Sequence, residues 1–227
     1  MVRPVRIAVV IPTLHEAHRI QDAIRSARAP GVEVIVADGG STDGTAERAR
    51  AEGARVLTCE PGRARQLQAG VRAAGENDAI LFLHADTTLP PGWAGAVSAA
   101  LADPRVVGGA FRFRFDERSL ALRVVEWGAR LRSELGGLPY GDQGLFVRRS
   151  ALEAVGGVPQ VPIMEDLDLV TALKRHGSLA LLREPAVTSA RRYREAGVVR
   201  TLLRHGLALG AFALGLDRAR VAAWVRR

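Results

Sequence analysis

Residues 32–45 read VEVIVADGGSTDGT and carry the pattern on which the fold prediction depends. A short run of β-branched residues is typical of a buried parallel strand, and the acidic loop after it leads into a predicted helix at 45–52. Two other segments repeat this order, IAVVIPTLHEA at 7–17 and AILFLHADT at 79–87. Because parallel strands end at one edge of a sheet, we expect these acidic loops to meet where open α/β sheets bind ligands.

The rest of the first half alternates in the same way, with strands expected at 7–11, 32–37, 55–57 and 79–83 and helices at 15–29, 45–52 and 63–73. This alternation predicts an α/β fold, with a mostly parallel central sheet and helices on both faces. The second half is mixed. It has predicted helices at 93–101, 119–135 and 166–176, and predicted strands at 109–115 and in GLFVRR at 144–149.

Length and composition fit one well-cored domain, since the chain has 227 residues of which 48% are hydrophobic. We divide it into a nucleotide-binding half at about 5–88, an acceptor half at about 89–195 and a basic amphipathic helical tail at about 196–227. The net charge of +8 favours anionic partners. From Arg183 onward there are ten arginines and three acidic residues, so +7 of that charge lies near the C-terminus.

The single cysteine, Cys59, and the absence of zinc-finger spacing favour a reducing, cytoplasmic location. The apolar N-terminus has no small-residue cleavage site and is better interpreted as a first strand than as a signal peptide. The longest late apolar run, residues 206–216, is shorter than the roughly 18 residues that a membrane span needs. No transmembrane helix is therefore expected.

Asp38 ends the second predicted strand, where its carboxylate could accept hydrogen bonds from a base or a ribose. Gly39 and Gly40 would let a ligand approach the backbone closely. The alternative is a simple turn, because residues 41–43 (Ser-Thr-Asp) are all good N-cap residues for the next helix. We favour ligand binding for Asp38 and capping for residues 41–43.

The segment GRARQ at 62–66 opens a predicted helix with two guanidinium groups, on Arg63 and Arg65, followed by Gln66. Positive charge at the positive end of a helix dipole suits a diphosphate. A solvated basic helix face would have the same sequence, so both interpretations remain open.

His84 and Asp86 are separated by one residue in the loop FLHADT at 82–87. In an extended segment, side chains at i and i+2 point the same way, so both could reach one ion. A divalent metal there would act as a Lewis acid for a departing nucleoside diphosphate. We favour Asp86 as the ligand, whereas His84 is equally compatible with simple packing at a strand end.

MEDLDL at 164–169 clusters acidic residues where a helix is predicted to begin, a position that the helix dipole alone would favour. The functional alternative is a general base that takes the proton from an attacking acceptor hydroxyl. We favour Asp166 as this base, with Glu165 positioning it and Asp168 as first-turn charge.

In order and spacing, these loops resemble family 2 glycosyltransferases, inverting enzymes of the GT-A fold that use nucleotide-diphospho-sugars. The matching motifs are Pro-Thr-Leu with Glu16, then VADGGSTDGT, then His-Ala-Asp at 84–86, then Glu165-Asp166, over about residues 5–195. GRARQ, LHADT and GDQGLFVRR further resemble a bacterial subgroup named for its association with radical-SAM and selenium-domain proteins.

The resemblance implies that Pro12, Glu16 and Asp38 hold the nucleoside, that Asp86 and a metal hold the diphosphate, and that Asp166 is the base. It also implies a closing role for two late arginines and a donor or acceptor role for residues 142–143. The residues expected to contact the nucleotide or donor sugar are Pro12, Thr13, Leu14, Glu16, Asp38, Gly40, Arg63, Arg65, Gln66, Ala85, Asp142, Gln143, Arg191 and Arg192.

The chain departs from the wider family at one position, because His84 stands where the family usually has the first aspartate of Asp-x-Asp. Imidazole suits Mn²⁺ better than Mg²⁺, so either metal, Mn or Mg, remains open as the cofactor.

The expected function is therefore transfer of a sugar from a UDP- or GDP-sugar to an acceptor hydroxyl, with no nucleic-acid partner. Lipid carriers, polysaccharides and small metabolites all remain open as acceptors, and the alternating Phe111, Phe113 and Phe115 weakly favour an apolar one.

Two other functions were considered beside glycosyl transfer. A sugar-nucleotide pyrophosphorylase would need a glycine-rich loop with Arg and Lys after the first strand, which PTLHE does not provide. An anionic-surface binding protein is favoured by the tail, where Leu202, Leu203 and Leu207 run beside Arg200 and Arg204. Peripheral contact of this tail with the inner face of a membrane could also accompany catalysis.

Overall fold

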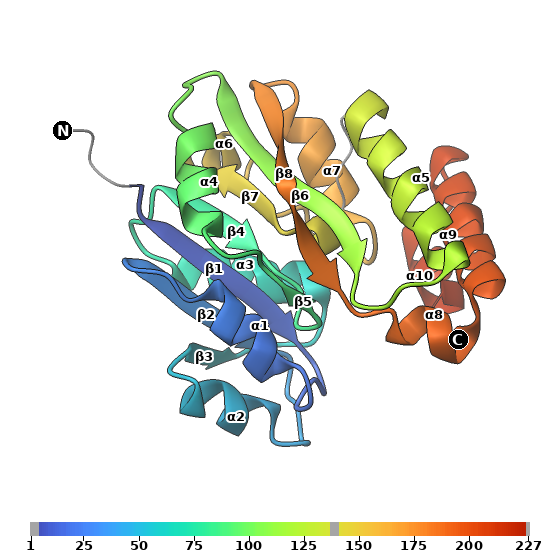
Figure 1. Ribbon diagram of the computed structural model, residues 1–227, viewed down its shortest axis with the longest axis horizontal. Coiled ribbons are helices and arrows are strands. Elements are labelled where there is room, and N and C mark those ends of the chain that lie inside the picture. Colours follow the sequence, from blue (N-terminus) through green and yellow to red (C-terminus); the bar gives the residue numbers. More distant parts are fainter. Residues whose placement is uncertain (1–4, 137–140, 226–227) are drawn as a thin grey trace.

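Strands and helices alternate through the first half of the chain, as the sequence predicts. The computed structural model describes residues 5–136 and 141–225 (Figure 1). Its strands are β1 (Ile7–Thr13), β2 (Val32–Asp38), β3 (Arg55–Thr58), β4 (Ala79–Phe82), β5 (Thr87–Thr88), β6 (Val106–Phe115), β7 (Leu145–Arg148) and β8 (Ser178–Thr188). Its helices are α1 (Ile20–Ala27), α2 (Thr45–Ala51), α3 (Arg63–Ala73), α4 (Trp93–Ala100), α5 (Leu120–Gly136), the 3₁₀ turn η1 (Gly141–Gln143), α6 (Arg149–Ala154), α7 (Glu165–Leu173), α8 (Arg191–Ala196), α9 (Val198–Ala213) and α10 (Arg218–Val225).

The strands form one sheet in the order β3-β2-β1-β4-β7-β6-β8-β5. The first four are parallel, whereas β7 runs antiparallel to both β4 and β6. Leu145, the first residue of β7, is opposite Phe82, the last residue of β4. The turn η1 that precedes β7 therefore lies at the same edge as the loops after β1, β2 and β4.

The sheet is covered on both faces, which explains why its parallel strands are apolar at almost every position. Alternate β1 residues enter different cores: Val9 packs in the cluster that includes α1 and α4, and Val10 in the cluster that includes α3 and α7. Both side chains are fully buried. The sheet continues through both predicted halves, because β4 pairs with β7 from beyond residue 88.

One strand and one helix differ from the expectation. Strand β8 was not predicted, because Arg183, Glu184 and Pro185 interrupt its apolar pattern; Pro185 lies at a shift in register with β6, where a proline is tolerated. Helix α1 begins at Ile20 and not at residue 15, since residues 14–17 form a loop in which His15 has a φ of 57°.

A separate group of helices, α5, α8, α9 and α10, lies beyond β6 and β8 (Figure 1). We call these four helices the helical lobe. Phe115 at the end of β6 joins the lobe to the sheet through an edge-on ring contact with Tyr193, at a centroid distance of 5.0 Å. Phe111 and Phe115 are buried core residues, and the apolar acceptor that the aromatic positions of β6 weakly favour stays a prediction. Among the described residues, no helix combines the length and apolarity needed to cross a bilayer.

Candidate functional site

The ends of β1 and β2 form the first wall of the candidate site. Thr13 and Asp38 are register neighbours, and Thr13 Oγ1 donates to Asp38 Oδ1 at 3.2 Å. The other Asp38 oxygen accepts from the backbone N–H groups of Gly40 (3.2 Å) and Ser41 (2.9 Å), and Ser41 Oγ donates to Oδ1 at 2.5 Å. Asp38 is only 2% exposed. Its carboxylate thus organises the glycine loop, and its expected contact with a nucleoside stays a prediction.

The loop after β2 also holds the loop after β1. Ser41 Oγ accepts from the backbone N–H of His15 at 2.9 Å, and Asp43 Oδ2 accepts from that of Ala17 at 3.1 Å. These bonds fix the left-handed turn at His15, a conformation that costs energy for a residue with a side chain. Residues 41 and 43 therefore support the loop that carries Leu14 and Glu16, and Leu14 itself is 44% exposed.

The three polar residues that open α3 have different environments. Gln66 is buried and donates through Nε2 to the carbonyl oxygens of Thr13 (2.7 Å) and Ala37 (2.8 Å). Arg65 is exposed and pairs with Glu60 at 2.9 Å. Residues 63 and 65 lie on different faces of the helix, and the expected contact of Arg65 with a diphosphate stays a prediction. Gln66 ties two strand ends together.

Arg63 alone enters the site and joins the two halves of the chain. Its Nε lies 2.8 Å from Glu165 Oε1, one of its terminal nitrogens lies 3.8 Å from Asp166 Oδ2, and that nitrogen also contacts His84 Nε2. Burial, together with the charges of Arg63 and Arg192, holds the pKa of His84 well below its ordinary value. His84 is therefore neutral, and Arg63 occupies its Nε2.

The proposed base is held by backbone geometry. Met164 adopts a left-handed φ of 64° directly before α7, which sets the direction of the two acids that follow. Asp166 Oδ2 accepts from the N–H of Gly141 at 2.8 Å. A Cβ on Gly141 would lie 2.2 Å from a terminal Arg63 nitrogen, so any other residue here would require the Arg63 side chain to shift. Burial raises the pKa of Glu165, against the opposing effect of Arg63.

These groups converge on one small cavity of about 10 Å³. Its walls include Arg63, His84, Gly141, Glu165 and Asp166, which come from four segments far apart in the sequence. The distant acids of the second half thus meet the loop after β4.

The turn η1 contains Asp142 and Gln143, which were predicted to have the same role but lie in different environments. Asp142 is half-buried, its Oδ1 has no hydrogen-bond partner among the described residues, and burial raises its pKa to about 6. Gln143 is buried and is used internally, because Nε2 donates to the carbonyl of Phe111 (3.0 Å) and Oε1 accepts from Ser133 (3.1 Å). Gln143 therefore supports β6 and α5, and Asp142 is the member of this pair that faces the acids of the site.

Asp86 and Glu16 form the remaining acidic part of the site. Burial and the neighbouring charge of Asp86 raise the pKa of Glu16, while Arg191, Arg19 and Arg192 lower it. Arg191 and Arg192, at the start of α8, are thus close enough to influence both sheet-edge loops. Among the described residues, no three His, Cys, Asp or Glu side chains form a complete metal-binding group. A metal bound here would take some of its ligands from a substrate.

Arg132 was not predicted as a site residue, because helix α5 is distant in the sequence and its arginines form no motif. Arg132 reaches across from α5 to Gln143 Oε1 at 3.3 Å and lowers the pKa of Asp142. Pro12 lies near the end of strand β1, and Ala85 lies buried in the loop after β4.

The profile described as glycosyl transferase family 2 matches residues 8–156, which contain β1 through α6 and three of the four acidic loops. This chain belongs to glycosyl transferase family 2. The protein is therefore a glycosyltransferase, and the expectation of a sugar-nucleotide pyrophosphorylase is set aside. A comparison with curated protein sequences finds no match.

Solved structures share the fold of this glycosyltransferase. Glucosyl-3-phosphoglycerate synthase from Mycobacterium tuberculosis, in complex with Mn²⁺, UDP and glucosyl-3-phosphoglycerate, is 25% identical with a TM-score of 0.63. The match covers 89% of this chain and 78% of that one. TarS from S. aureus is 16% identical with a TM-score of 0.64, over 88% of this chain and 39% of that one. Both support the predicted GT-A fold, and the narrower radical-SAM-associated subgroup stays a prediction.

Proposed function

We propose that this glycosyltransferase moves a sugar from a nucleoside-diphosphate donor to an acceptor hydroxyl with inversion, and that Asp166 is the general base. The observation that carries the proposal is the convergence of Arg63, His84, Glu165 and Asp166 on one pocket at the sheet edge. A relative of this chain, glucosyl-3-phosphoglycerate synthase, was solved with Mn²⁺ and UDP-glucose, which favours a UDP-sugar over a GDP-sugar.

Asp166 is suited to accept a proton. Its Oδ2 is oriented by the Gly141 N–H, and a terminal nitrogen of Arg63 lies 3.8 Å from the same oxygen. Glu165 is buried and ion-paired with Arg63, so it acts in this proposal as the residue that fixes the guanidinium. Direct attack by the acceptor hydroxyl at the anomeric carbon then needs one base and no covalent enzyme intermediate.

The residues at the loop after β4 fit a divalent metal that shares its coordination with a diphosphate. Such metals commonly bind one or two carboxylates and complete their shell with phosphate oxygens and water. Asp86 would supply the carboxylate, and His84 could contribute only after Arg63 releases Nε2. The bound metal would neutralise charge on the departing nucleoside diphosphate. Arg191 and Arg192 would contact the same diphosphate from α8, and Pro12, Glu16 and the Asp38 loop would hold the nucleoside.

The test is a nucleotide-sugar panel with and without Mn²⁺, read by thermal shift and by release of nucleoside diphosphate. We expect stabilisation by UDP with Mn²⁺, and loss of that stabilisation in Asp86→Asn. Asp166→Asn should keep donor binding and lower turnover by about 100- to 10,000-fold, the usual contribution of a general base. The matched control is Asp22→Asn, because Asp22 is an exposed carboxylate on α1.

Two results would contradict the proposal. If no nucleotide sugar or nucleoside diphosphate shifts the melting temperature, the donor assignment is wrong. If Asp166→Asn turns over as fast as Asp22→Asn, the donor assignment stands and another group is the base.

A further inference from the structure

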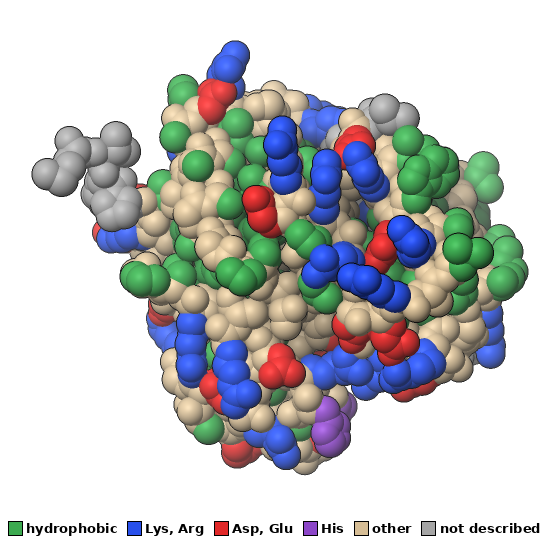
Figure 2. All heavy atoms as spheres, in the orientation of Figure 1, with side chains coloured by type: hydrophobic (Ala, Val, Ile, Leu, Met, Phe, Trp, Pro, Cys, Tyr) green, Lys and Arg blue, Asp and Glu red, His purple; other side chains and the backbone are tan. Residues whose placement is uncertain are grey.

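Exposed large hydrophobic side chains are concentrated in the helical lobe and the turn that joins α9 to α10. Among the described residues twelve are prominent, and only Leu14 lies elsewhere. The other eleven are Leu120, Val124, Trp127, Leu131, Val199, Leu202, Leu203, Leu207, Leu214, Leu216 and Trp224. Figure 2 shows hydrophobic side chains gathered over α5 and α9. A surface of this kind on a globular fold marks a binding site for a large partner.

Helix α5 carries a complete apolar stripe that faces away from the sheet. Leu120, Val124, Trp127 and Leu131 recur at helical spacing, with exposed fractions of 82%, 61%, 64% and 40%. The opposite side of the helix already packs on β6, where Leu122 is buried. The exposed stripe is therefore additional to the face that the fold uses.

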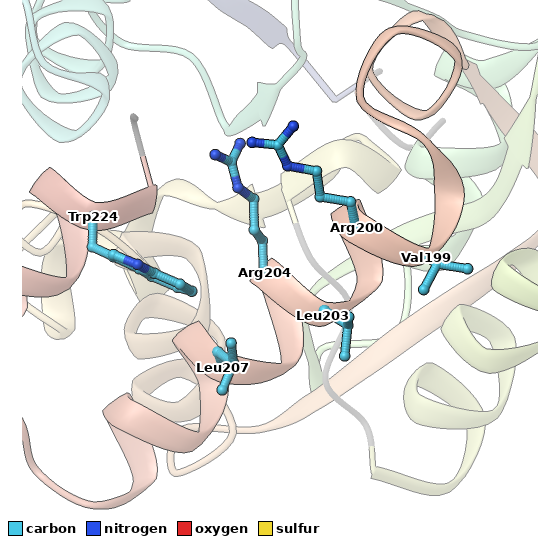
Figure 3. A pocket seen from close by; sticks show the side chains of 6 residues that line it. All are labelled: Val199, Arg200, Leu203, Arg204, Leu207 and Trp224. Atoms are coloured by element: carbon cyan, nitrogen blue, oxygen red, sulfur yellow. The ribbon is translucent and has the colours of Figure 1, made fainter.

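Helices α9 and α10 border an open groove of about 780 Å³ that combines apolar and cationic side chains. Figure 3 shows the guanidinium groups of Arg200 and Arg204 side by side, whereas Leu203 and Leu207 point to the other side of α9. The Trp224 ring extends from α10 toward this helix. Arginine has a long apolar stem and a charged end, which suits a side chain that snorkels at a lipid interface.

We propose that the helical lobe binds the surface of an anionic lipid bilayer. Charge complementarity selects this occupant, because residues 198–213 include two arginines and no acidic residue. A second copy of the chain would bring Arg200 and Arg204 against like charges with no carboxylate of α9 to balance them. Anionic headgroups supply that balance, and tryptophan and leucine enter the headgroup boundary beside them.

The lobe lies beside the candidate site, since α5 contacts η1 through Arg132 and Gln143. If the proposed function holds, adsorption would bring the site near acceptors in the bilayer. Vesicle binding itself needs neither donor nor metal, so its test is independent of that function.

The test is co-sedimentation of the full chain with vesicles of phosphatidylcholine alone or with added phosphatidylglycerol. We expect binding to the anionic vesicles that weakens with salt. Arg200→Gln/Arg204→Gln should weaken it about 25-fold, because each arginine near an anionic surface contributes about fivefold in affinity. The matched control is Arg48→Gln/Arg72→Gln, which removes the same charge from exposed positions of α2 and α3.

A second variant, Trp127→Ser/Leu203→Ser, should lower binding at least about tenfold through lost apolar contact. Circular dichroism melting checks that all variants fold. The proposal is overturned if the chain shows no preference for anionic vesicles, or if the two arginine pairs lose binding equally. A dimer that Trp127→Ser/Leu203→Ser dissociates would also overturn it in favour of a second copy.

Discussion

Replacing Asp142 with asparagine should stabilise the folded protein at neutral pH and leave its stability unchanged in acid. Asp142 is half-buried at the site, and its Oδ1 has no hydrogen-bond partner among the described residues. Burial raises its pKa, Arg132 opposes this, and the charge of Asp166 adds to it. The wild-type protein therefore holds a carboxylate where a neutral group is preferred, and asparagine keeps the shape without the charge.

The magnitude follows from the shift of the pKa from 3.8 to about 6. A group whose pKa is higher in the folded state binds its proton more tightly there, so the free energy of unfolding falls as the pH rises between these values. At 1.36 kcal/mol per pKa unit, the loss is about 3 kcal/mol when the pH exceeds both values. The substituted asparagine does not titrate, so the variant should gain about 3 kcal/mol on wild type between pH 4 and pH 7.

The measurement is urea unfolding of both proteins across this pH range. Glu16 and Glu165 also have raised pKa values, but they titrate in both proteins and cancel in the difference. Asp103→Asn is a control of opposite sign, because hydrogen bonds from Arg105 lower the pKa of Asp103 to about 2. That variant should be less stable than wild type at neutral pH. A difference between Asp142→Asn and wild type that does not vary with pH would refute the reasoning.

Two further substitutions, with a third as a control, test the packing of the sheet and its helices by urea unfolding. Gln66→Leu should cost about 1–3 kcal/mol, because it removes two buried hydrogen bonds, those from Gln66 Nε2 to the carbonyl oxygens of Thr13 and Ala37; no loss would mean that water replaces the amide. Gly109→Ala should cost about 1–3 kcal/mol or more, since the new Cβ would lie 2.1 Å from the Ala180 carbonyl oxygen. Gly95→Ala, which meets nothing within 4 Å, should stabilise α4 by about 0.5–1 kcal/mol; equal effects of the two alanines would contradict the packing argument.

The first half of the fold was predictable because its structure is local. Strands β1 and β4 are apolar runs followed by helices or loops with clear signals, so the sequence pattern identifies them, and helix α3 has the predicted bounds. The convergence of the loops after β1, β2 and β4 follows from the direction of parallel strands. The place of Asp142 did not follow in this way, because it depends on the antiparallel pairing of β7 with β4.

The electrostatic partners in the site could not be predicted, since they come from distant parts of the chain. Arg63 and Glu165 are separated by about a hundred residues, and nothing local distinguishes the inward Arg63 from the exposed Arg65. Gln66 and Gln143 were expected to contact the ligand from their places in the motifs. In the structure, the side-chain N–H groups of both donate to buried backbone carbonyl oxygens. Burial decides this outcome, because an unpaired buried carbonyl is more costly than an unmade contact with a ligand.

The helical lobe also contacts α7, the helix that carries the proposed base, through one ion pair. The strength of this pair limits how far α10 can influence α7. Arg218 of α10 donates to Asp168 of α7 at 3.1 Å, two residues after the proposed base Asp166. Both side chains are partly exposed, at 30% and 26%, and pairs of this kind contribute about 1 kcal/mol or less. Such an energy could change the orientation of α7 by a factor of about five in population, too little to switch a general base on or off. This ion pair would therefore carry no allosteric control of the base, whereas α8 of the lobe reaches the site through Arg191 and Arg192. Adsorption of the lobe would also act through location, by setting which acceptors reach Asp166.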